Sequence, residues 1–285
     1  MARGKTIQIY LPDGNPKGIK ICEIPNSIIK AIQIPRNLIG EAQEYENLAK
    51  VGIYFLFSEK DESSQFKTYI GEAEEIKKRL KQHDNPEKDY WNYAVCFISG
   101  KDNLNKAHIK FLESFCYEEA QKYKRTELMN NVFPTRSSLS PSEEDFALQF
   151  FDEIKLILGT LGYPLFDNIK KARKEEDIFY CKKKDASATG NLTERGFVIY
   201  KGSKANKENR PSSNEGISYL RESLVNSKIM KEENGVFVFT EDFETSSPSM
   251  AAAVVIGGNA NGWLEWKNSE GKTLDELKRK KENSS

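Results

Sequence analysis

The pattern of apolar and polar positions changes twice along the chain. Up to residue 50, apolar positions alternate with polar ones in short runs separated by turn residues, which is typical of β-strands. We therefore predict a small β-rich extension over 1–50. The next stretch combines strand-like and helix-like periods: strands at 51–57, 66–70 and 91–98, and helices at 72–83, 105–123 and 140–159. Because 51–57 is almost continuously apolar, we expect it at the centre of a three-stranded antiparallel sheet flanked by the helices.

Beyond residue 165 the apolar segments are shorter, and polar residues are more frequent. Lysine clusters at 170–174 and 182–184 lead us to place a basic linker over 166–185. The remainder, 186–285, predicts a second small domain: strands at 196–200, 235–240 and 263–266, and helices at 217–228 and 250–256. The predicted fold class is thus α+β, with a central domain over 51–165 between the N-terminal extension and the C-terminal domain.

The charges balance over the whole chain but not within it. Lys and Arg together number 43, as do Asp and Glu, so the net charge does not indicate a nucleic-acid-binding protein. Residues 168–210, in contrast, contain 12 Lys or Arg and 6 Asp or Glu. Such a segment can contact phosphates without reading sequence. It is also typical of a solvated linker whose lysines maintain solubility, and charge alone favours this second interpretation.

Several classes of protein do not fit the sequence. No apolar run approaches the roughly 18 residues that a membrane-spanning helix needs, and no secretory signal is visible at the N-terminus. The four cysteines are far apart and form no CxxC pair, so we expect neither a disulfide framework nor a zinc knuckle. With only two histidines, a His-rich metal site is excluded. These observations favour a cytoplasmic protein.

Five polar side chains of the central domain are spaced so that they can meet. Tyr54 and Tyr69 lie on the first two predicted strands, and the loop between these strands is short enough for a hairpin. Arg79 and His83 are four residues apart on the predicted helix, so both project from one side of it. Glu113 falls at the edge of the apolar stripe of the second helix, where a carboxylate needs a positive partner such as a divalent metal.

Each of these residues has an ordinary structural interpretation when taken alone. Tyr54 can be a strand aromatic that packs on a neighbour, and Arg79 can form an ion pair with Glu75 one turn earlier. His83 suits the C-terminal end of a helix, and Glu113 suits a solvated helix position. The combination at these spacings is harder to explain structurally and favours a functional site.

The same residues resemble the signature of the GIY-YIG nucleases. Gly-Ile-Tyr stands at 52–54 and Tyr-Ile-Gly at 69–71, followed by the arginine, the histidine, the glutamate and a downstream asparagine. The resemblance covers 50–165. It implies a fold that hydrolyses phosphodiester bonds, DNA rather than RNA as the nucleic-acid partner, and one Mg²⁺ or Mn²⁺ as the cofactor.

The resemblance also implies a role for each residue. Glu113 would ligate the metal, and Arg79 would contact the scissile phosphate. Tyr54 would act as the general base for water, directly or through His83, and Tyr69 would bind the water or the phosphate. Some relatives assign the base to the second tyrosine, so the two phenols stay interchangeable at this point. A free phenol, with a pKa of about 10, is a poor base at neutral pH unless Arg79 and the metal lower that pKa.

Two positions of the signature stay open. Asn130 and Asn131 are both available for the asparagine that positions the substrate, and we favour Asn131. Many relatives carry a lysine after Tyr-Ile-Gly, whereas this chain has Glu72. Without that lysine the site has a weaker affinity for phosphate, unless Lys67 or Lys78 supplies the missing positive charge.

The C-terminal region, 177–280, resembles an uncharacterised domain that often follows such nucleases and, more weakly, the RAMA domain of modification and restriction systems. The motifs are Gly-Phe-Val-Ile-Tyr-Lys-Gly-Ser at 196–203, Ser-Pro-Ser-Met-Ala-Ala-Ala-Val at 247–254 and Asn-Gly-Trp-Leu-Glu-Trp at 261–266. Because no cluster of catalytic polar residues occurs there, the region is either a binding or targeting module or a domain that packs on the nuclease. Trp263 and Trp266 are expected in the core rather than in base stacking.

Three functions compete on this basis. The first is a metal-dependent DNA endonuclease in restriction or phage defence, whose C-terminal domain targets the substrate. The second is a catalytically silent nucleic-acid-binding module that uses the nuclease fold as a scaffold, and the third is an interaction protein that acts within a larger complex. Since one site cuts one strand, a double-strand cut requires a homodimer or two visits. The extension over 1–50 is the surface that we expect a homodimer to use.

Overall fold

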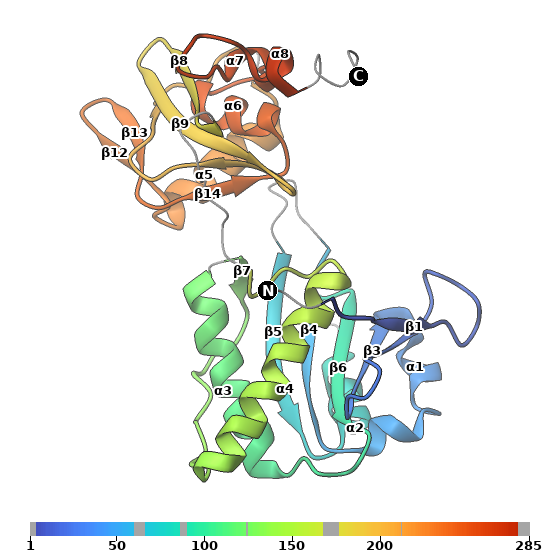
Figure 1. Ribbon diagram of the computed structural model, residues 1–285. Helices are drawn as coiled ribbons and strands as arrows, with labels where there is room; N and C mark the ends of the chain where they lie inside the picture. The colour runs from blue at the N-terminus through green and yellow to red at the C-terminus, as the bar shows by residue number, and fades with distance from the viewer. Residues whose placement is uncertain are drawn as a thin grey trace. The chain divides into compact units, whose positions relative to one another are not determined.

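The computed structural model describes residues 4–59, 66–85, 90–123, 125–167, 177–211 and 213–278. Its contacts divide the chain into two compact units (Figure 1). The first unit contains the described residues up to 167, close to the predicted end of the central domain at 165. The second contains the described residues from 177 onward. The lysine cluster at 170–174 lies outside the described residues.

The first unit is built on a seven-stranded sheet with the order β1-β2-β3-β6-β4-β5-β7. Its strands are β1 (Gln8–Tyr10), β2 (Lys20–Glu23), β3 (Ile29–Pro35), β4 (Gly52–Phe57), β5 (Phe66–Ala73), β6 (Tyr93–Ser99) and β7 (Thr126–Leu128). Neighbouring strands are antiparallel except β5 and β7, which run parallel. The predicted antiparallel trio lies within this sheet, with β4 between β6 and β5 and every residue of β4 buried.

The structure places two boundaries of this unit differently from the sequence pattern. The stretch 1–50 is not a separate extension, because β3 pairs with β6 along seven residues and joins β1 and β2 to the central sheet. The helix expected from residue 72 also begins later. Residues 71–73 continue the ladder opposite 52–54, so β5 extends through them and α2 (Ile76–His83) follows.

Helices cover both faces of this sheet (Figure 1). One face carries α1 (Ile39–Ala42) and α2, with short 3₁₀ turns at Arg36–Leu38 and Glu46–Ala49, and the other carries α3 (Lys106–Tyr123) and α4 (Pro141–Thr160). The start of α4 is the one that the sequence predicts. The carboxylate of Glu143 accepts the amide of Ser140 at 2.9 Å, which completes a capping box.

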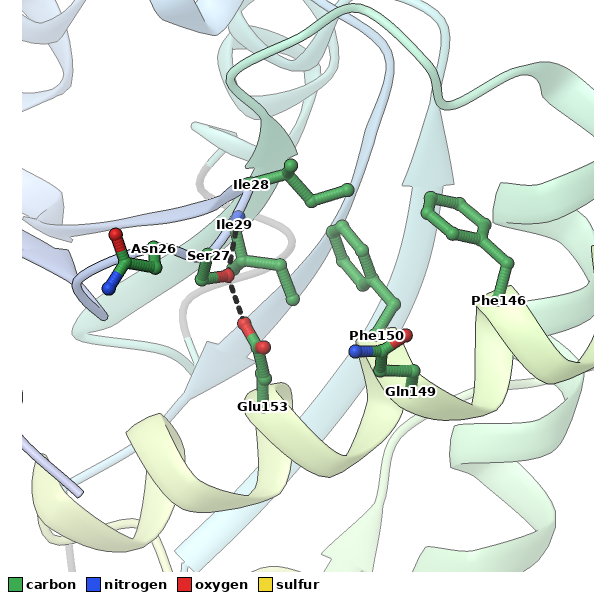
Figure 2. Close-up of a pocket in the computed structure, with 8 residues that line it drawn as sticks. All are labelled: Asn26, Ser27, Ile28, Ile29, Phe146, Gln149, Phe150 and Glu153. Atoms are coloured by element: carbon green, nitrogen blue, oxygen red, sulfur yellow. Dashed lines mark hydrogen bonds between the residues drawn. The ribbon is translucent and has the colours of Figure 1, made fainter.

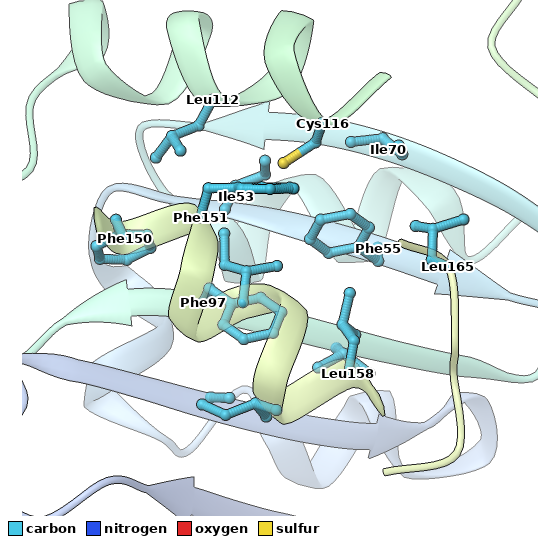
Figure 3. Close-up of a cluster of buried hydrophobic side chains, with 14 of the residues drawn as sticks. Ile53, Phe55, Ile70, Phe97, Leu112, Cys116, Phe150, Phe151, Leu158 and Leu165 are labelled. Atoms are coloured by element: carbon cyan, nitrogen blue, oxygen red, sulfur yellow. The ribbon is translucent and has the colours of Figure 1, made fainter. Parts of the chain in front are cut away.

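Alternation along β4 sends its side chains into two separate cores. Ile53 and Phe55 point toward α3 and α4, where they join Phe97 in a large apolar cluster (Figure 3). Burial of one such side chain contributes about 1.5–3 kcal/mol. Tyr54 and Leu56 point to the opposite face, into the cluster beneath α1 and α2. The most buried strand of the unit therefore carries a phenol into a core.

The second unit is also a sheet with helices packed on it. Its strand order is β12-β13-β11-β9-β10-β14, and β8 pairs with β9. The strands are β8 (Phe179–Lys183), β9 (Ala186–Thr193), β10 (Gly196–Ile199), β11 (Lys204–Asn206), β12 (Met230–Glu233), β13 (Val236–Phe239) and β14 (Phe243–Thr245). The helices are α5 (Glu215–Asn226), α6 (Pro248–Ile256), α7 (Gly262–Glu265) and α8 (Leu274–Lys278). Both units thus have the α+β character that the sequence predicts.

Helix α6 lies at the centre of this second core, and seven of its nine residues are buried. It ends where the sequence predicts and begins two residues earlier, at Pro248. The hydroxyl of Ser247 accepts the amide of Met250 at 3.1 Å as an N-cap. Gly257 ends the helix in the left-handed conformation, with φ of 84°, which a glycine adopts without strain.

The predicted strand at 263–266 is wrong. Residues 262–265 form the short helix α7, because the side chain of Asn261 caps it by accepting the amide of Trp263 at 3.2 Å. Trp266 follows the helix and is fully buried, with its indole donating to the carbonyl of Pro248 at 3.0 Å. The expectation that Trp266 belongs to the core is confirmed.

The predicted linker over 166–185 is too long. Phe179 and Cys181 are fully buried in the second core, so 179–183 forms the strand β8 rather than a solvated connection. The lysines at 182–184 therefore belong to a folded strand and its turn. Within the described residues, no helix combines the length and apolar character needed to cross a membrane.

Candidate active site

Tyr54 lies at the centre of a buried polar cluster on the α2 face of the first sheet. Its ring is fully buried, and its hydroxyl oxygen is 2.8 Å from Nε2 of His83. Nε of Arg79 donates to the same oxygen at 3.2 Å. Arg79 and His83 are one turn apart on α2, so the helix presents both to the strand. The indole of Trp91 donates to the backbone carbonyl of His83 at 3.2 Å, which holds the end of the helix in place.

Tyr69 completes this cluster from the neighbouring strand β5. Its ring centroid lies 6.1 Å from that of Tyr54 and 4.9 Å from that of His83. Tyr69 is half-buried, whereas Tyr54 is fully buried. Of the two phenols, Tyr69 is therefore the more exposed one.

The glycines of the two tripeptides make room for this cluster. Gly71 is directly opposite Tyr54 in the ladder between β4 and β5, and a Cβ atom at position 71 would overlap the ring and hydroxyl of Tyr54. A Cβ atom at Gly52 would overlap the carbonyl oxygen of Phe97 and would press on Ile76 at the start of α2. A residue without a side chain is therefore required at each position for geometric reasons.

Arg79 does not form the surface ion pair that its sequence neighbours allow. Glu75 pairs instead with Lys78, with 2.5 Å between the charged atoms. Arg79 is half-buried, and its Nη1 atom donates to the side chain of Gln82 at 2.9 Å while Nε holds Tyr54. The guanidinium is thus oriented by Gln82 and by the phenols of Tyr54 and Tyr69 rather than by a carboxylate.

The environment of Tyr54 keeps its phenol neutral. Burial raises the pKa of Tyr54 well above its usual value, and the nearby Tyr69 raises it further, while Arg79 offsets only part of this. Tyr54 and His83 share one hydrogen bond, and the tautomer of His83 decides which of them donates. Because Arg79 donates to the phenolic oxygen, the phenolic hydrogen can point to Nε2 of His83 when that nitrogen carries no hydrogen.

Glu113 lies on the other side of the sheet from this cluster. It lies half-buried on α3, and its carboxylate accepts a hydrogen bond from the backbone of Glu72 in β5. Burial raises the pKa of Glu113 to about 7, and the charge of Glu72 adds to this, while Arg79 acts in the opposite direction. Glu113 thus lies on the α3 face of the sheet, opposite the α2 face that carries Tyr54, Arg79 and His83.

The outward edge of β5 is occupied by side chains and by the chain that leaves β7. The strand β7 pairs only with residues 66–68, and the amide of Met129 then donates to the carbonyl of Thr68 at 2.9 Å. At Ile70 the side chain of Asn130 takes the position of a neighbouring strand. It accepts a hydrogen bond from the backbone amide of Ile70 at 3.1 Å and donates one to the carbonyl of Ile70 at 2.7 Å. Glu113 occupies the next outward position, at residue 72. The edge therefore ends in side chains instead of a further strand.

The structure brings Asn130, not Asn131, to this edge. Asn130 is half-buried and holds the backbone between Tyr69 and Gly71, whereas Asn131 is exposed. The preference for Asn131 therefore does not agree with the geometry. The physical reason is that only the first of the two side chains faces β5 when the chain leaves β7.

For a hard cation, this edge offers the half-buried carboxylate of Glu113, with Glu72 nearby. In the parts of the chain that the structure describes, no three His, Cys, Asp or Glu side chains lie together as a metal-binding group. Glu113 is the carboxylate that would hold Mg²⁺ or Mn²⁺, with water and phosphate oxygens as the other ligands. Its raised pKa indicates a carboxylate that lacks compensating positive charge, which a divalent cation would supply.

The lysines considered as substitutes at this site are differently placed. Lys67 is exposed and lies 3.7 Å from Glu127 of β7, and Lys78 is engaged by Glu75 on the solvent side of α2. Arg79 is thus the cation that directly contacts the buried cluster. A phosphate at the site would depend on it and on the metal.

A cavity elsewhere in the first unit is separate from this cluster. It has a volume of about 190 Å³ and lies between the turn at 26–29 and α4, where the hydroxyl of Ser27 donates to the carboxylate of Glu153 (Figure 2). Phe146 and Phe150 contribute apolar surface. Because its lining belongs to the α4 face, it is not part of the candidate site.

Comparison with known proteins gives one match. A family described as a domain of unknown function, DUF4357, matches residues 179–278, which is the second unit from β8 to α8. The match agrees with the expectation of an uncharacterised domain in this region and names no activity. No curated protein and no solved structure matched the chain.

Sequence reasoning missed two features that position the site. The anchoring role of Asn130 depends on the hydrogen-bonding edge of β5, and the choice between adjacent asparagines has no local signal. The proximity of Glu72 to Glu113 was also missed. The alternation of side chains along β5 predicts that Glu72 lies near Glu113, since residue 72 faces α3 when residue 71 faces α2.

Proposed function

We propose that the first unit is a divalent-metal-dependent DNA endonuclease. The observation that carries this proposal is the hydroxyl of Tyr54, which lies within hydrogen-bonding distance of both Nε2 of His83 and Nε of Arg79. A buried phenol between a proton acceptor and a guanidinium serves no packing purpose that a phenylalanine would not serve. The arrangement suits the activation of a nucleophile beside an anionic group.

Each residue of the cluster would have a separate role in phosphodiester hydrolysis. Arg79 would hold the scissile phosphate through guanidinium atoms beyond Nε. Tyr54 would accept the proton of the attacking water while its own proton passes to Nε2 of His83, so that the phenol remains neutral throughout. Tyr69, the more open phenol, would orient the water or a phosphate oxygen.

Glu113 would hold the metal at the edge of β5. The bound cation would stabilise the charge that develops on the phosphate and on the leaving oxygen. The ordinary pKa of a carboxyl group is about 4.3, and that of Glu113 is raised to about 7. Cation binding therefore displaces a proton from part of the Glu113 population at neutral pH. Asn130 supports this site indirectly, because it holds the strand that carries Tyr69.

The second unit would target or position the substrate. Its separate sheet and core allow it to act as an accessory domain. A place in restriction or phage defence follows from the resemblance of the signature residues to the GIY-YIG nucleases. A homodimer would allow both strands of a duplex to be cut. Its contact surface would not be a detachable extension, since 1–50 is part of the sheet.

The test is cleavage of supercoiled plasmid DNA with Mg²⁺ or Mn²⁺. The wild-type chain is expected to nick or linearise the plasmid, and Glu113→Gln should lower the rate on the order of 10²-fold or more. Glu119→Gln is the matched control, because Glu119 lies on the same helix and pairs with Lys122. Plasmid that stays intact with the wild-type protein and either metal would contradict the proposal, as would equal losses in the two variants.

A binding measurement separates the competing function. If the wild-type protein retains plasmid in a gel-shift experiment but never cleaves it, the first unit is a silent binding module. If activity appears only when a second chain copurifies, the protein acts as part of a complex. Methylated and unmethylated plasmid in parallel would show whether base modification controls cleavage.

A further inference from the structure

One face of the second sheet carries a row of lysines that crosses five strands. The ladder places Lys182 opposite Ser187, Ser187 opposite Lys204, Lys204 opposite Val238, and Val238 opposite Lys231. Residues directly opposite each other on neighbouring strands project from the same face. The row therefore alternates lysines with short side chains from β8 to β12.

A second row lies beside the first on the same face. Tyr180 is two residues before Lys182 on β8, so both side chains point the same way. Tyr180 is opposite Thr189 on one side and opposite Lys267 on the other, with backbone hydrogen bonds of 2.7 and 3.0 Å to Lys267. The ring of Tyr180 is 36% exposed, which leaves part of its surface open beside the lysines.

This face is the solvent side of the sheet. The intervening residues Cys181, Ala188 and Ala205 point the other way and are buried in the core that contains α6. The two rows contain four lysines, and all are exposed: Lys182, Lys204, Lys231 and Lys267. Among the described residues, the ion pair that these lysines form is the one between Lys231 and Glu233, at 2.5 Å. Neither row contains a carboxylate, and the carboxylates that the ladder places on this face lie away from the centre of the rows, Glu233 on β12 and Glu244 on β14.

We propose that this face binds the phosphodiester backbone of a single strand of nucleic acid. Neighbouring strands are about 4.8 Å apart, so Lys182 and Lys204 project about 10 Å apart, and Lys231 continues the same line. A single line of cations matches one backbone. Lysine ammonium groups supply phosphate contacts that do not depend on sequence.

The shape of the face favours a single strand over a duplex. Ser187 and Val238 are short, so the ammonium groups of the lysines are the outermost part of the row and are positioned for a backbone rather than for base edges. Tyr180 offers an aromatic surface on which an unpaired base can stack, a contact that a paired base within a duplex does not make. The inference does not rest on the nuclease proposal, since binding requires neither the metal nor cleavage.

The experiment measures binding of the full chain to a short, labelled single-stranded DNA and to the matching duplex, by fluorescence anisotropy in EDTA over a series of salt concentrations. The single strand is expected to bind more tightly than the duplex. The double variant Lys182→Gln/Lys204→Gln should weaken single-strand binding on the order of tenfold or more at low salt. It should also reduce the slope of log affinity against log salt by about 1.4, because each lost phosphate contact removes about 0.7.

A matched double variant controls for net charge. Lys207→Gln/Lys272→Gln removes the same charge from two exposed lysines of this unit that pair with Glu232 and Glu270 instead of lying in the rows. It should leave the salt slope close to the wild-type value. The variant Lys182→Arg/Lys204→Arg keeps the charges and should keep the affinity.

Tyr180→Leu tests the stacking contact. It should weaken single-strand binding about fivefold or more without changing the salt slope, because it removes an aromatic surface and no charge. Equal losses in the two lysine-to-glutamine double variants would overturn the proposal, and so would tighter binding of the duplex. Absence of single-strand binding by the wild-type chain at low salt would also overturn it, while leaving the cleavage proposal untouched because that is tested with metal on plasmid.

Discussion

Each unit buries polar side chains beneath its sheet, but the partners of those side chains differ. In the first unit, the hydroxyl of Tyr54 meets the side chains of His83 and Arg79. In the second, the guanidinium of Arg221 is almost fully buried and donates to backbone carbonyls: those of Val254, Asn206 and Lys207. Carbonyl groups cannot exchange protons, whereas an imidazole and a phenol can.

The comparison shows that burial of a polar group does not by itself indicate function. Arg221 ties α5 to α6 and to the end of β11, and its partners hold that position permanently. Burial lowers the pKa of Arg221 to about 10, so it stays charged at neutral pH. Tyr54 has partners that can take and return a proton. The chemistry of the partners is what separates a candidate catalytic group from an architectural one.

The largest expected effect comes from removing one oxygen atom. Tyr54→Phe should lower the rate of metal-dependent plasmid cleavage on the order of 10²-fold or more, because the proton path from water to His83 passes through that hydroxyl. Initial rates of nicking measure it. Tyr163→Phe is the control, since Tyr163 also accepts a side-chain hydrogen bond, from Gln33 at 3.2 Å, but lies on the other face of the sheet. Loss of rate in both variants would show that the fold, not the hydroxyl, was affected.

Arg221→Met should destabilise the second unit by on the order of 3 kcal/mol. The change keeps most of the side-chain volume but leaves several buried carbonyls without a donor. Urea unfolding followed by circular dichroism would measure the shift, with the exposed Lys228→Met as the control. The cleavage rate of the folded protein should change little. If Arg221→Met abolished cleavage without lowering stability, Arg221 would not be a structural group, and the contrast drawn between Arg221 and Tyr54 would be incorrect.

Glu113→Gln should make the metal-free protein more stable at pH 8 than the wild type. The pKa of Glu113 in the folded chain is raised to about 7, so the folded state holds a proton that the unfolded state releases at lower pH. Wild-type stability therefore falls as the pH rises from about 4 toward 7, and the glutamine variant avoids this loss. Allowing for the partial exposure of the group, the gain is on the order of 1–2 kcal/mol.

Thermal unfolding at several pH values measures this difference between Glu113→Gln and the wild type. The difference should vanish near pH 4, where both side chains are neutral, and Mg²⁺ should reduce it at pH 8 by stabilising the wild-type carboxylate. A stability difference that does not depend on pH would show that the raised pKa is not its cause.

The smallest effect is expected at the edge of β5. Asn130→Ala removes both hydrogen bonds to the backbone of Ile70 and should cost about 1–2 kcal/mol of stability. It should also lower the cleavage rate several-fold by loosening Tyr69. Asn131→Ala should do neither, because Asn131 is exposed. Equal effects at the two positions would mean that Asn130 does not act through the strand.

Local sequence signals predict those parts of the site that depend on a single element. The spacing of Arg79 and His83 fixes their common side of α2, and the two tripeptides place both phenols on adjacent strands. The start of α4 follows from Ser140 and Glu143. These features need no information from distant residues.

Other parts of the structure depend on contacts that no local pattern contains. The pairing of β3 with β6 joins 1–50 to the sheet, and only the register between distant strands decides it. Residues 263–266, with two tryptophans, suggest a strand, yet the cap supplied by Asn261 and the burial of Trp266 select a helical turn. Asn130 was passed over because its partner at Ile70 lies 60 positions earlier in the chain.

The termination of β5 by side chains has a consequence for assembly. An open strand edge is a template on which another chain can add a strand and begin aggregation. Here Met129, Asn130 and Glu113 already occupy the outward hydrogen-bonding positions at Thr68, Ile70 and Glu72. The residues that shape the candidate site therefore also block the addition of another strand at this edge of the sheet.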